Sequence, residues 1–166
     1  MDRPRAAAAS ALFFAVAPGV VAGVVPLVLT QWQMGDAPLA VRGIGAVVLA
    51  TSVPLLVSAF VRFVVDGRGT PAPVAPTEHL VVTGAYRYVR NPMYVAVVMA
   101  ILGQAALLGR PVLVAYGLVA FATMAAFVIG YEEPTLAARY GAEYDAYRAA
   151  VRPWWPRATP YRAPLR

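Results

Sequence analysis

The sequence predicts an all-α, multi-pass helical membrane protein with about four transmembrane segments and a C-terminal amphipathic helix at the membrane interface. Of its 166 residues, 60% are hydrophobic and only 13% are charged, and the mean hydropathy is +0.64. This balance is too apolar for an ordinary soluble domain. Four stretches approach or exceed the roughly 20 residues that a helical span requires. They are Ala9–Thr30, Gly43–Val65, Met93–Gly109 and Pro111–Gly130.

The first two stretches are long enough to span a membrane outright. Pro26 falls inside the first of them, and a proline there is tolerated where a neighbouring helix satisfies the backbone group that it frees. The third and fourth stretches are shorter, and only Arg110 separates them. We therefore predict a tight helical hairpin from these two, which need not cross the bilayer squarely.

The distribution of arginine predicts the orientation in the membrane. All 14 basic residues are arginine, and only Arg42 and Arg110 fall in the loops between spans one and two and between spans three and four. The positive-inside rule then places both termini and the long central loop in the cytoplasm, in a bacterial inner (plasma) membrane. The arginines flank apolar spans without a nucleic-acid-binding motif, so we expect no nucleic acid as a partner.

A polar linker divides the chain into two halves of one expected domain. Asp66–Pro76 (DGRGTPAPVAP) is rich in proline and glycine and shows neither helical nor strand periodicity. Residues 1–76 form a two-span front half with its linker, and residues 77–166 form a back half rich in polar and aromatic groups. The chain has no cysteine and a single histidine, His79, so we expect no metal site.

The run from Thr83 to Tyr94 (TGAYRYVRNPMY) carries the densest chemistry, at the edge of an apolar stretch. Asn91 can accept a hydrogen bond from the first free N–H groups of a helix, and Pro92 fits the first helical position. We therefore predict a helix start beside Arg87 and Arg90. Its N-terminal end carries a partial positive charge and suits an anionic group such as a carboxylate or a phosphate.

Two adjacent carboxylates follow the fourth apolar stretch, in Tyr131-Glu132-Glu133-Pro134. Two interpretations stay open for Glu132 and Glu133. Both can mark the exit of a helix into water, or at least one can face a pocket, pair with an arginine or bind a cationic or hydroxyl-bearing ligand.

The segment Thr135–Val151 is predicted to be an amphipathic helix. Its apolar face recurs at helical spacing through Leu136, Tyr140, Tyr144, Tyr147 and Val151. Such a tyrosine-rich face is typical of a membrane interface, or of packing over a neighbouring helix end. The tail that follows contains Trp154 and Trp155 between prolines, for which we predict interfacial anchoring.

Together these groups suit a ligand that has a carboxylate, an amine, ribose hydroxyls and an aromatic base. S-adenosylmethionine is such a ligand, although nucleotides and lipid headgroups share many of the same contacts.

The succession LVVTGAYRYVRNPMY, YEEPTL and YGAEYDAYRAAVRPWWPR resembles the isoprenylcysteine carboxyl methyltransferase family, which is related to the phospholipid methyltransferases. The resemblance covers roughly residues 78–157. It implies a multi-helix membrane enzyme that binds S-adenosylmethionine at its cytoplasmic face and methylates a lipophilic acceptor that reaches it from the bilayer.

The resemblance also implies a set of cofactor contacts. Carried over residue by residue, these fall on Glu78, His79, Leu80, Val81, Tyr86, Asn91, Pro92, Met93, Tyr94 and Glu132. The charges beside the predicted helix start add Arg90 and Glu133. No general base is assigned, and Glu132, Glu133 and Tyr94 are the candidates.

Two departures from the family pattern bear on the function. The family commonly has Arg-His-Pro where this chain has Arg90-Asn91-Pro92, and asparagine cannot serve as an acid or a base. Eukaryotic members look to have an arginine for the substrate carboxylate where this chain has Val128. Three functions therefore stay open: methylation of an isoprenylcysteine-type carboxylate, N-methylation of a phospholipid or small amine, and a non-catalytic role in membrane binding or assembly.

Overall fold

The computed structural model describes residues 16–67 and 79–162, and every regular element within them is a helix. This confirms the predicted all-α class. The turns η1 and η3 are π-helical, and η2 is a 3-10 helix. In chain order the elements are η1 Val20–Val24, α2 Val25–Thr30, α3 Leu39–Gly67, η2 Gly84–Arg87, α4 Pro92–Leu108, α5 Val112–Phe127, η3 Val128–Glu132, α6 Glu133–Tyr140 and α7 Ala142–Ala150.

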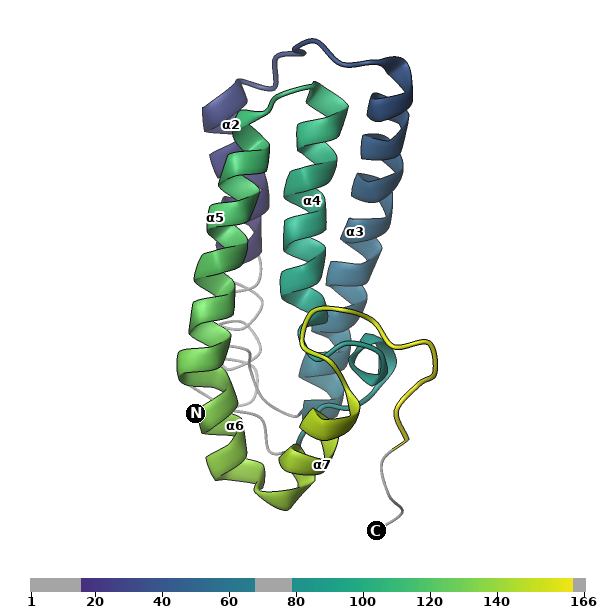
Figure 1. The fold of residues 1–166 in the computed structure, drawn as a ribbon, viewed down its shortest axis with the longest axis vertical. Coiled ribbons are helices and arrows are strands. Elements are labelled where there is room, and N and C mark those ends of the chain that lie inside the picture. The colour runs from purple at the N-terminus through teal and green to yellow at the C-terminus, as the bar shows by residue number, and fades with distance from the viewer. Residues whose placement is uncertain (1–15, 68–78, 163–166) are drawn as a thin grey trace.

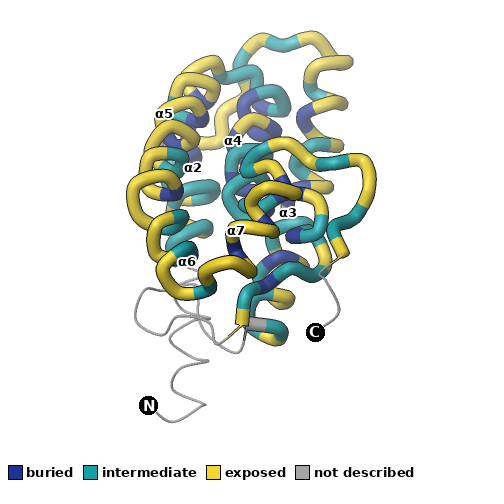
Figure 2. The backbone as a smooth tube through the Cα atoms, turned by 60° about the horizontal axis from the view of Figure 1, so that its bottom comes forward, coloured by how far each residue is buried: buried dark blue, intermediate teal, exposed yellow. Residues whose placement is uncertain are grey.

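The long helices stand side by side as an upright bundle (Figure 1). Helix α4 packs between α3 and α5, and η1 and α2 pack on α4 and α5. A cluster of buried residues that includes Val97, Ile101 and Leu113 forms the core between α4 and α5. Figure 2 shows the buried positions on the inner sides of these helices and the exposed ones facing outward. The α2–α3 and α4–α5 connections lie at one end, and α6, α7 and the C-terminal segment lie at the other (Figure 1).

Two of the described helices are long and apolar enough to cross a membrane. They run over Leu39–Asp66 and Val112–Tyr140, and Val16–Thr30 and Pro92–Leu108 are shorter apolar helices. At 1.5 Å per residue each long helix measures about 42 Å, more than the roughly 30 Å of a hydrocarbon core. A crossing by four segments stays a prediction, because the first predicted span begins at Ala9, outside the described residues.

The helix contact between α3 and α4 is close because glycine occupies it on both sides. A Cβ atom on Gly45 would lie 2.4 Å from the backbone nitrogen of Leu107, and one on Gly103 would lie 2.9 Å from that of Leu49. Small residues at such positions let helix backbones approach within a membrane. This contact holds α4, and therefore the start of α4, at a fixed position beside α3.

Each of the two π-turns precedes a proline. At the second π-turn, η3, the structure corrects the predicted end of the helix that contains the fourth span. The helix does not end at Tyr131–Pro134; it continues to Tyr140. In η3 the N–H of Glu133 donates to Val128 O. We attribute the continuity to this wider turn, which gives the ring of Pro134 room that a regular α-turn would deny it.

The same arrangement occurs in the first helix, where η1 precedes Pro26. Because Pro26 has no N–H, the carbonyl oxygen of Ala22 has no intrahelical donor from that position. The amide of Gln104 on α4 donates to this oxygen at 2.7 Å, and the hydroxyl of Tyr116 on α5 donates to Val21 O at 2.8 Å. The neighbouring helices therefore supply the bonds that the proline removes, as the sequence led us to expect.

The predicted amphipathic helix Thr135–Val151 is wrong as a single helix. Its first part is the end of the helix that begins at Val112, and its second part is α7. Gly141 separates them with φ +52° and ψ −128°, a backbone conformation that glycine adopts far more readily than other residues. This break turns α7 back toward the start of α4 (Figure 1).

Candidate functional site

A cavity of about 990 Å³ lies between the start of α4, the η3–α6 region and α7. Ten of the twelve predicted cofactor residues line it: Leu80, Val81, Tyr86, Arg90, Asn91, Pro92, Met93, Tyr94, Glu132 and Glu133. His79 is exposed and is not among the lining residues, and Glu78 lies outside the described residues. The structure thus brings together groups that lie up to 53 positions apart, since both Leu80 and Glu133 line one cavity.

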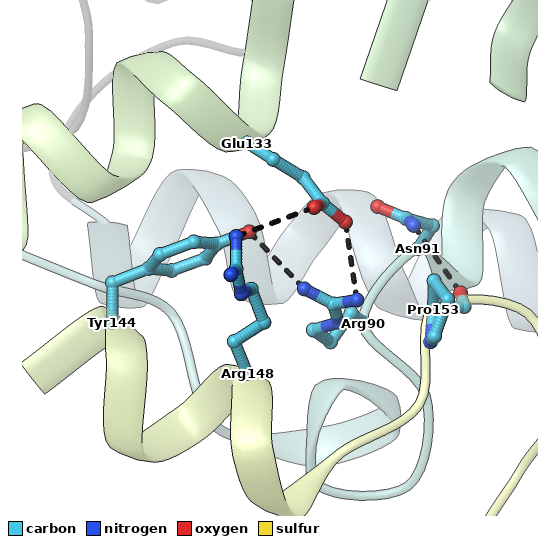
Figure 3. Close-up of polar contacts among 6 residues, drawn as sticks. All are labelled: Arg90, Asn91, Glu133, Tyr144, Arg148 and Pro153. Carbon is cyan, nitrogen blue, oxygen red and sulfur yellow. Dashed lines mark hydrogen bonds and ion pairs between the residues drawn. The ribbon is translucent and has the colours of Figure 1, made fainter. Parts of the chain in front are cut away.

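The start of α4 forms one wall of the cavity. Asn91 occupies the N-cap position and Pro92 is the first helical residue, as predicted, but the Asn91 side chain does not cap the helix. Its amide instead donates to the carbonyl oxygen of Pro153 at 3.2 Å (Figure 3). The predicted capping bond is therefore wrong, because a distant carbonyl competes for the side chain. Among the described residues no side chain caps this helix end, which borders the cavity with its partial positive charge.

Arg90 is held beside this helix start by partners from two other elements. Its guanidinium lies 3.1 Å from Glu133 Oε1 and donates to the Tyr144 hydroxyl at 3.3 Å. Arg148 of α7 approaches the second Glu133 oxygen at 3.7 Å, so Glu133 lies between the two arginines (Figure 3). The Arg90 side chain is only 9% exposed, and its Nε has no hydrogen-bond partner among the described residues.

Glu132 has a different partner from its neighbour. The hydroxyl of Tyr94 donates to Glu132 Oε1 at 2.5 Å, which fixes α4 against the π-turn η3. Both carboxylates line the cavity, and Glu133 pairs with an arginine. The pocket-facing interpretation of the two carboxylates is therefore the one that the structure supports.

Three tyrosines close the side of the cavity nearest α7. Tyr144 and Tyr147 are 2% and 3% exposed, so the tyrosine face of this segment packs inward over the start of α4. The hydroxyl of Tyr147 donates to Tyr86 O at 2.7 Å. The hydroxyl of Tyr86 itself is buried, and within the described parts of the chain it has no partner.

Burial raises the pKa of Tyr86 and of Tyr147 further above physiological pH. Desolvation, and then the neighbouring charges of Tyr147, Glu132 and Tyr94, raise the pKa of Tyr86 well above its usual value. Desolvation also raises the pKa of Tyr147, although the charge of Arg90 opposes this shift. Both hydroxyls therefore stay protonated at physiological pH, and Tyr86 is one of the residues that line the cavity.

A C-terminal segment, Val151–Tyr161, runs along the loop that precedes α4. Three backbone bonds of 2.9 Å join them: Arg90 N to Arg152 O, Arg157 N to Tyr88 O and Tyr161 N to Arg87 O. The bond from Asn91 to Pro153 adds a fourth tie. The loop that carries Arg90 and Asn91 is therefore held in place from the C-terminal side.

The other end of the cavity is apolar and extends between the first helix and α5. This part of the wall consists of Ala17, Pro18, Val21, Met124, Phe127 and Val128. Val128 is 1% exposed and presents an isopropyl group where the family resemblance leads us to look for an arginine. The cavity therefore joins a polar end, rich in hydrogen-bonding groups, to an apolar end at membrane depth.

Several site residues escaped the sequence analysis. Tyr144, Arg148 and Pro153 contact the predicted residues directly, yet only the first belonged to a pattern that we had noted. The helical spacing of the tyrosines was the available signal for Tyr144. No signal pointed to Pro153, which contributes only a backbone oxygen.

A membrane-embedded helical bundle with a polar, ligand-sized cavity at one end defines the class of this protein. A sequence model of the phospholipid methyltransferase family matches residues 41–143, so the chain belongs to that family and is a membrane methyltransferase. This is also the membrane methyltransferase family of the isoprenylcysteine carboxyl methyltransferase-like proteins, as the sequence motifs indicated. No curated protein and no solved structure matches the chain.

Proposed function

We propose that the chain, acting as one domain, transfers a methyl group from S-adenosylmethionine to a lipophilic acceptor. The observation that carries this proposal is the start of α4, which borders a cavity beside two buried polar groups that have no hydrogen-bond partner in residues 16–67 and 79–162. These groups are the Nε of Arg90 and the hydroxyl of Tyr86. Buried polar groups are nearly always hydrogen-bonded, so their lack of partners supports a polar ligand at this place.

The proposed contacts follow the charges of the cavity. The helix start and Arg90 suit the carboxylate of the cofactor, and Glu132 suits its amine or ribose hydroxyls. Tyr86 offers a neutral donor, and Leu80, Val81 and Met93 offer apolar surface. The proposed cofactor set is thus the ten predicted residues that line the cavity, without His79.

When bound, S-adenosylmethionine would supply a methyl group on a sulfonium centre, which is transferred by direct displacement. The work of the protein is then to align the acceptor and to exclude water. The bonds that fix Arg90, Tyr94 and Glu132 pre-organise this end of the cavity. The apolar end is suited to an acyl or prenyl chain.

Two acceptors fit this arrangement, and we favour a phospholipid or small amine over an isoprenylcysteine-type carboxylate. Val128 offers no charge to an anionic acceptor, and the matching family is that of phospholipid methyltransferases. Titration of S-adenosylmethionine into the detergent-solubilised protein by calorimetry tests the cofactor. Labelled cofactor with membrane lipid extract, followed by mass spectrometry, tests the acceptor. Binding without transfer to any lipid or metabolite would instead support a non-catalytic role.

Replacing Glu132 by Gln should weaken cofactor binding about ten- to a hundredfold. A hydrogen bond to a charged group is worth roughly 1.5–3 kcal/mol, and the amide oxygen of Gln can still accept the bond from Tyr94. We therefore expect nearly unchanged thermal stability without ligand. Calorimetry and a melting curve on the same preparation measure both quantities. Unaltered affinity would remove Glu132 from the proposed cofactor set.

We also propose that both termini and the cavity lie on the cytoplasmic side of a bacterial inner membrane. The α2–α3 loop, which contains Asp36, lies at the end of the bundle opposite to α7 (Figure 1). Reporter fusions after Arg166 and near Asp36 should therefore report opposite sides of the membrane. The same signal from both fusions would contradict this orientation.

A further inference from the structure

We propose that the C-terminal segment presents a binding surface for anionic phospholipid headgroups, formed by Arg152, Trp155 and Arg157. This surface lies outside residues 41–143, which match the family. It also lies outside the cavity. The inference therefore stands apart from the proposed methyl transfer.

The segment is held at the membrane boundary of the bundle. Pro153 accepts a hydrogen bond from Asn91 at the first turn of α4, where the apolar part of that helix begins. The ring of Trp154 packs edge-on against Phe121 with their centroids 5.1 Å apart. Phe121 is exposed on α5, which belongs to a helix long and apolar enough to span. Trp154 thus extends along a lipid-facing helix while its backbone stays at the level of the α4 start.

The groups beside Trp154 have the composition of a membrane-surface contact. Trp155 is 72% exposed, and amphipathic aromatic rings favour the headgroup level of a bilayer. Arg152 is exposed and Arg157 partly so, and neither has an acidic group within 4 Å among the described residues. From Val151 to Arg162 the sequence contains no Asp or Glu.

These charges favour an anionic lipid over a soluble anion. Phe121 is exposed on a helix that is long and apolar enough to span a membrane, and a basic residue near an anionic membrane surface gains about 1 kcal/mol. One such residue corresponds to a roughly fivefold preference for an anionic over a neutral lipid. Arg152 and Arg157 together correspond to a roughly thirtyfold preference. The same arginines without the adjacent Trp155 and Phe121 would offer nothing specific to a lipid.

The test measures quenching of tryptophan fluorescence by lipids with brominated chains in reconstituted full-length protein. A Trp32→Phe background confines the emission to Trp154 and Trp155. Brominated phosphatidylglycerol and brominated phosphatidylcholine are compared at equal mole fraction in phosphatidylcholine vesicles. We expect phosphatidylglycerol to associate roughly thirtyfold more strongly, and Arg152→Gln with Arg157→Gln to remove this preference.

Two matched variants test whether the lipid preference depends on positive charge at this surface. They control for a change in the fold and for a change in the total charge of the protein. Arg152→Lys with Arg157→Lys keeps the charge and should keep most of the preference. Arg62→Gln removes another exposed arginine, at the end of α3, and should leave the preference unchanged.

Three outcomes would overturn the proposal. The first is equal quenching of the parent by the two lipids, and the second is an undiminished preference in the double Gln variant that melts like the parent. The third is loss of the preference when inorganic phosphate replaces chloride at equal ionic strength, which would identify a site for free phosphate.

Discussion

Replacing Asn91 by Asp is expected to abolish S-adenosylmethionine binding while the protein stays folded. The new carboxylate would stand at the start of α4, where we place the carboxylate of the cofactor. Two like charges about 4 Å apart repel by about 4 kcal/mol at an effective dielectric constant of 20, or about a thousandfold in affinity. Calorimetric titration of the variant measures the loss directly.

Asn91→Ala is the matched control for this experiment. Both substitutions remove the bond to Pro153, which costs about 1 kcal/mol of stability, but only Asp adds charge. Asn91→His restores the residue common in the family and should preserve binding. If the Asp variant binds as tightly as the Ala variant, the cofactor carboxylate does not lie at this helix end.

Replacing Glu133 by Ala is expected to have the largest effect on stability. It leaves the guanidinium of Arg90, only 9% exposed, without its carboxylate partner. Removing one member of a buried ion pair typically costs about 3–5 kcal/mol. Denaturant titration of the unliganded protein in mild detergent, followed by circular dichroism, would measure this loss.

Arg148→Gln provides the comparison, because it removes only the second and more exposed partner of Glu133. An exposed ion pair contributes at most about 1 kcal/mol, so this variant should unfold nearly like the parent. Combining Arg90→Met with Glu133→Leu should recover much of the stability, since no buried charge is left unpaired. Equal losses from Glu133→Ala and Arg148→Gln would show that the buried pair with Arg90 is not the dominant contact.

The parts of the site that could be predicted from the sequence are those with local signals. An Asn-Pro step before an apolar run marked the start of α4, since proline is favoured at the first helical position. The family motifs pointed to Tyr94 and Glu132, which the structure joins by a hydrogen bond. Such signals depend on a few neighbouring residues and do not require knowledge of the fold.

The errors arose where distant or subtle backbone interactions decide the structure. Asn91 was predicted to cap its own helix, but Pro153, 62 residues away, takes its amide. The carboxylates Glu132 and Glu133 were open to interpretation as the exit of a helix, but the π-turn η3 keeps the helix continuous through them. Gly141 lies inside the predicted helix Thr135–Val151, but the helical spacing of the tyrosines on both sides of it favoured one continuous helix. The periodicity itself was informative, because it correctly marked the face that packs inward.

The ties between Val151–Tyr161 and the loop before α4 have a consequence for biosynthesis. The 62 residues from Pro92 to Pro153 take roughly 3–12 s to translate at 5–20 residues per second. At the end of that interval α4 and α5 have already been synthesised. The backbone oxygens of Arg152 and Pro153, to which Arg90 and Asn91 donate hydrogen bonds, are the last part of the site to be made. The end of this protein that holds the cavity is therefore completed only after its apolar helices have left the ribosome, and a nascent chain arrested before residue 151 carries an unfinished cavity.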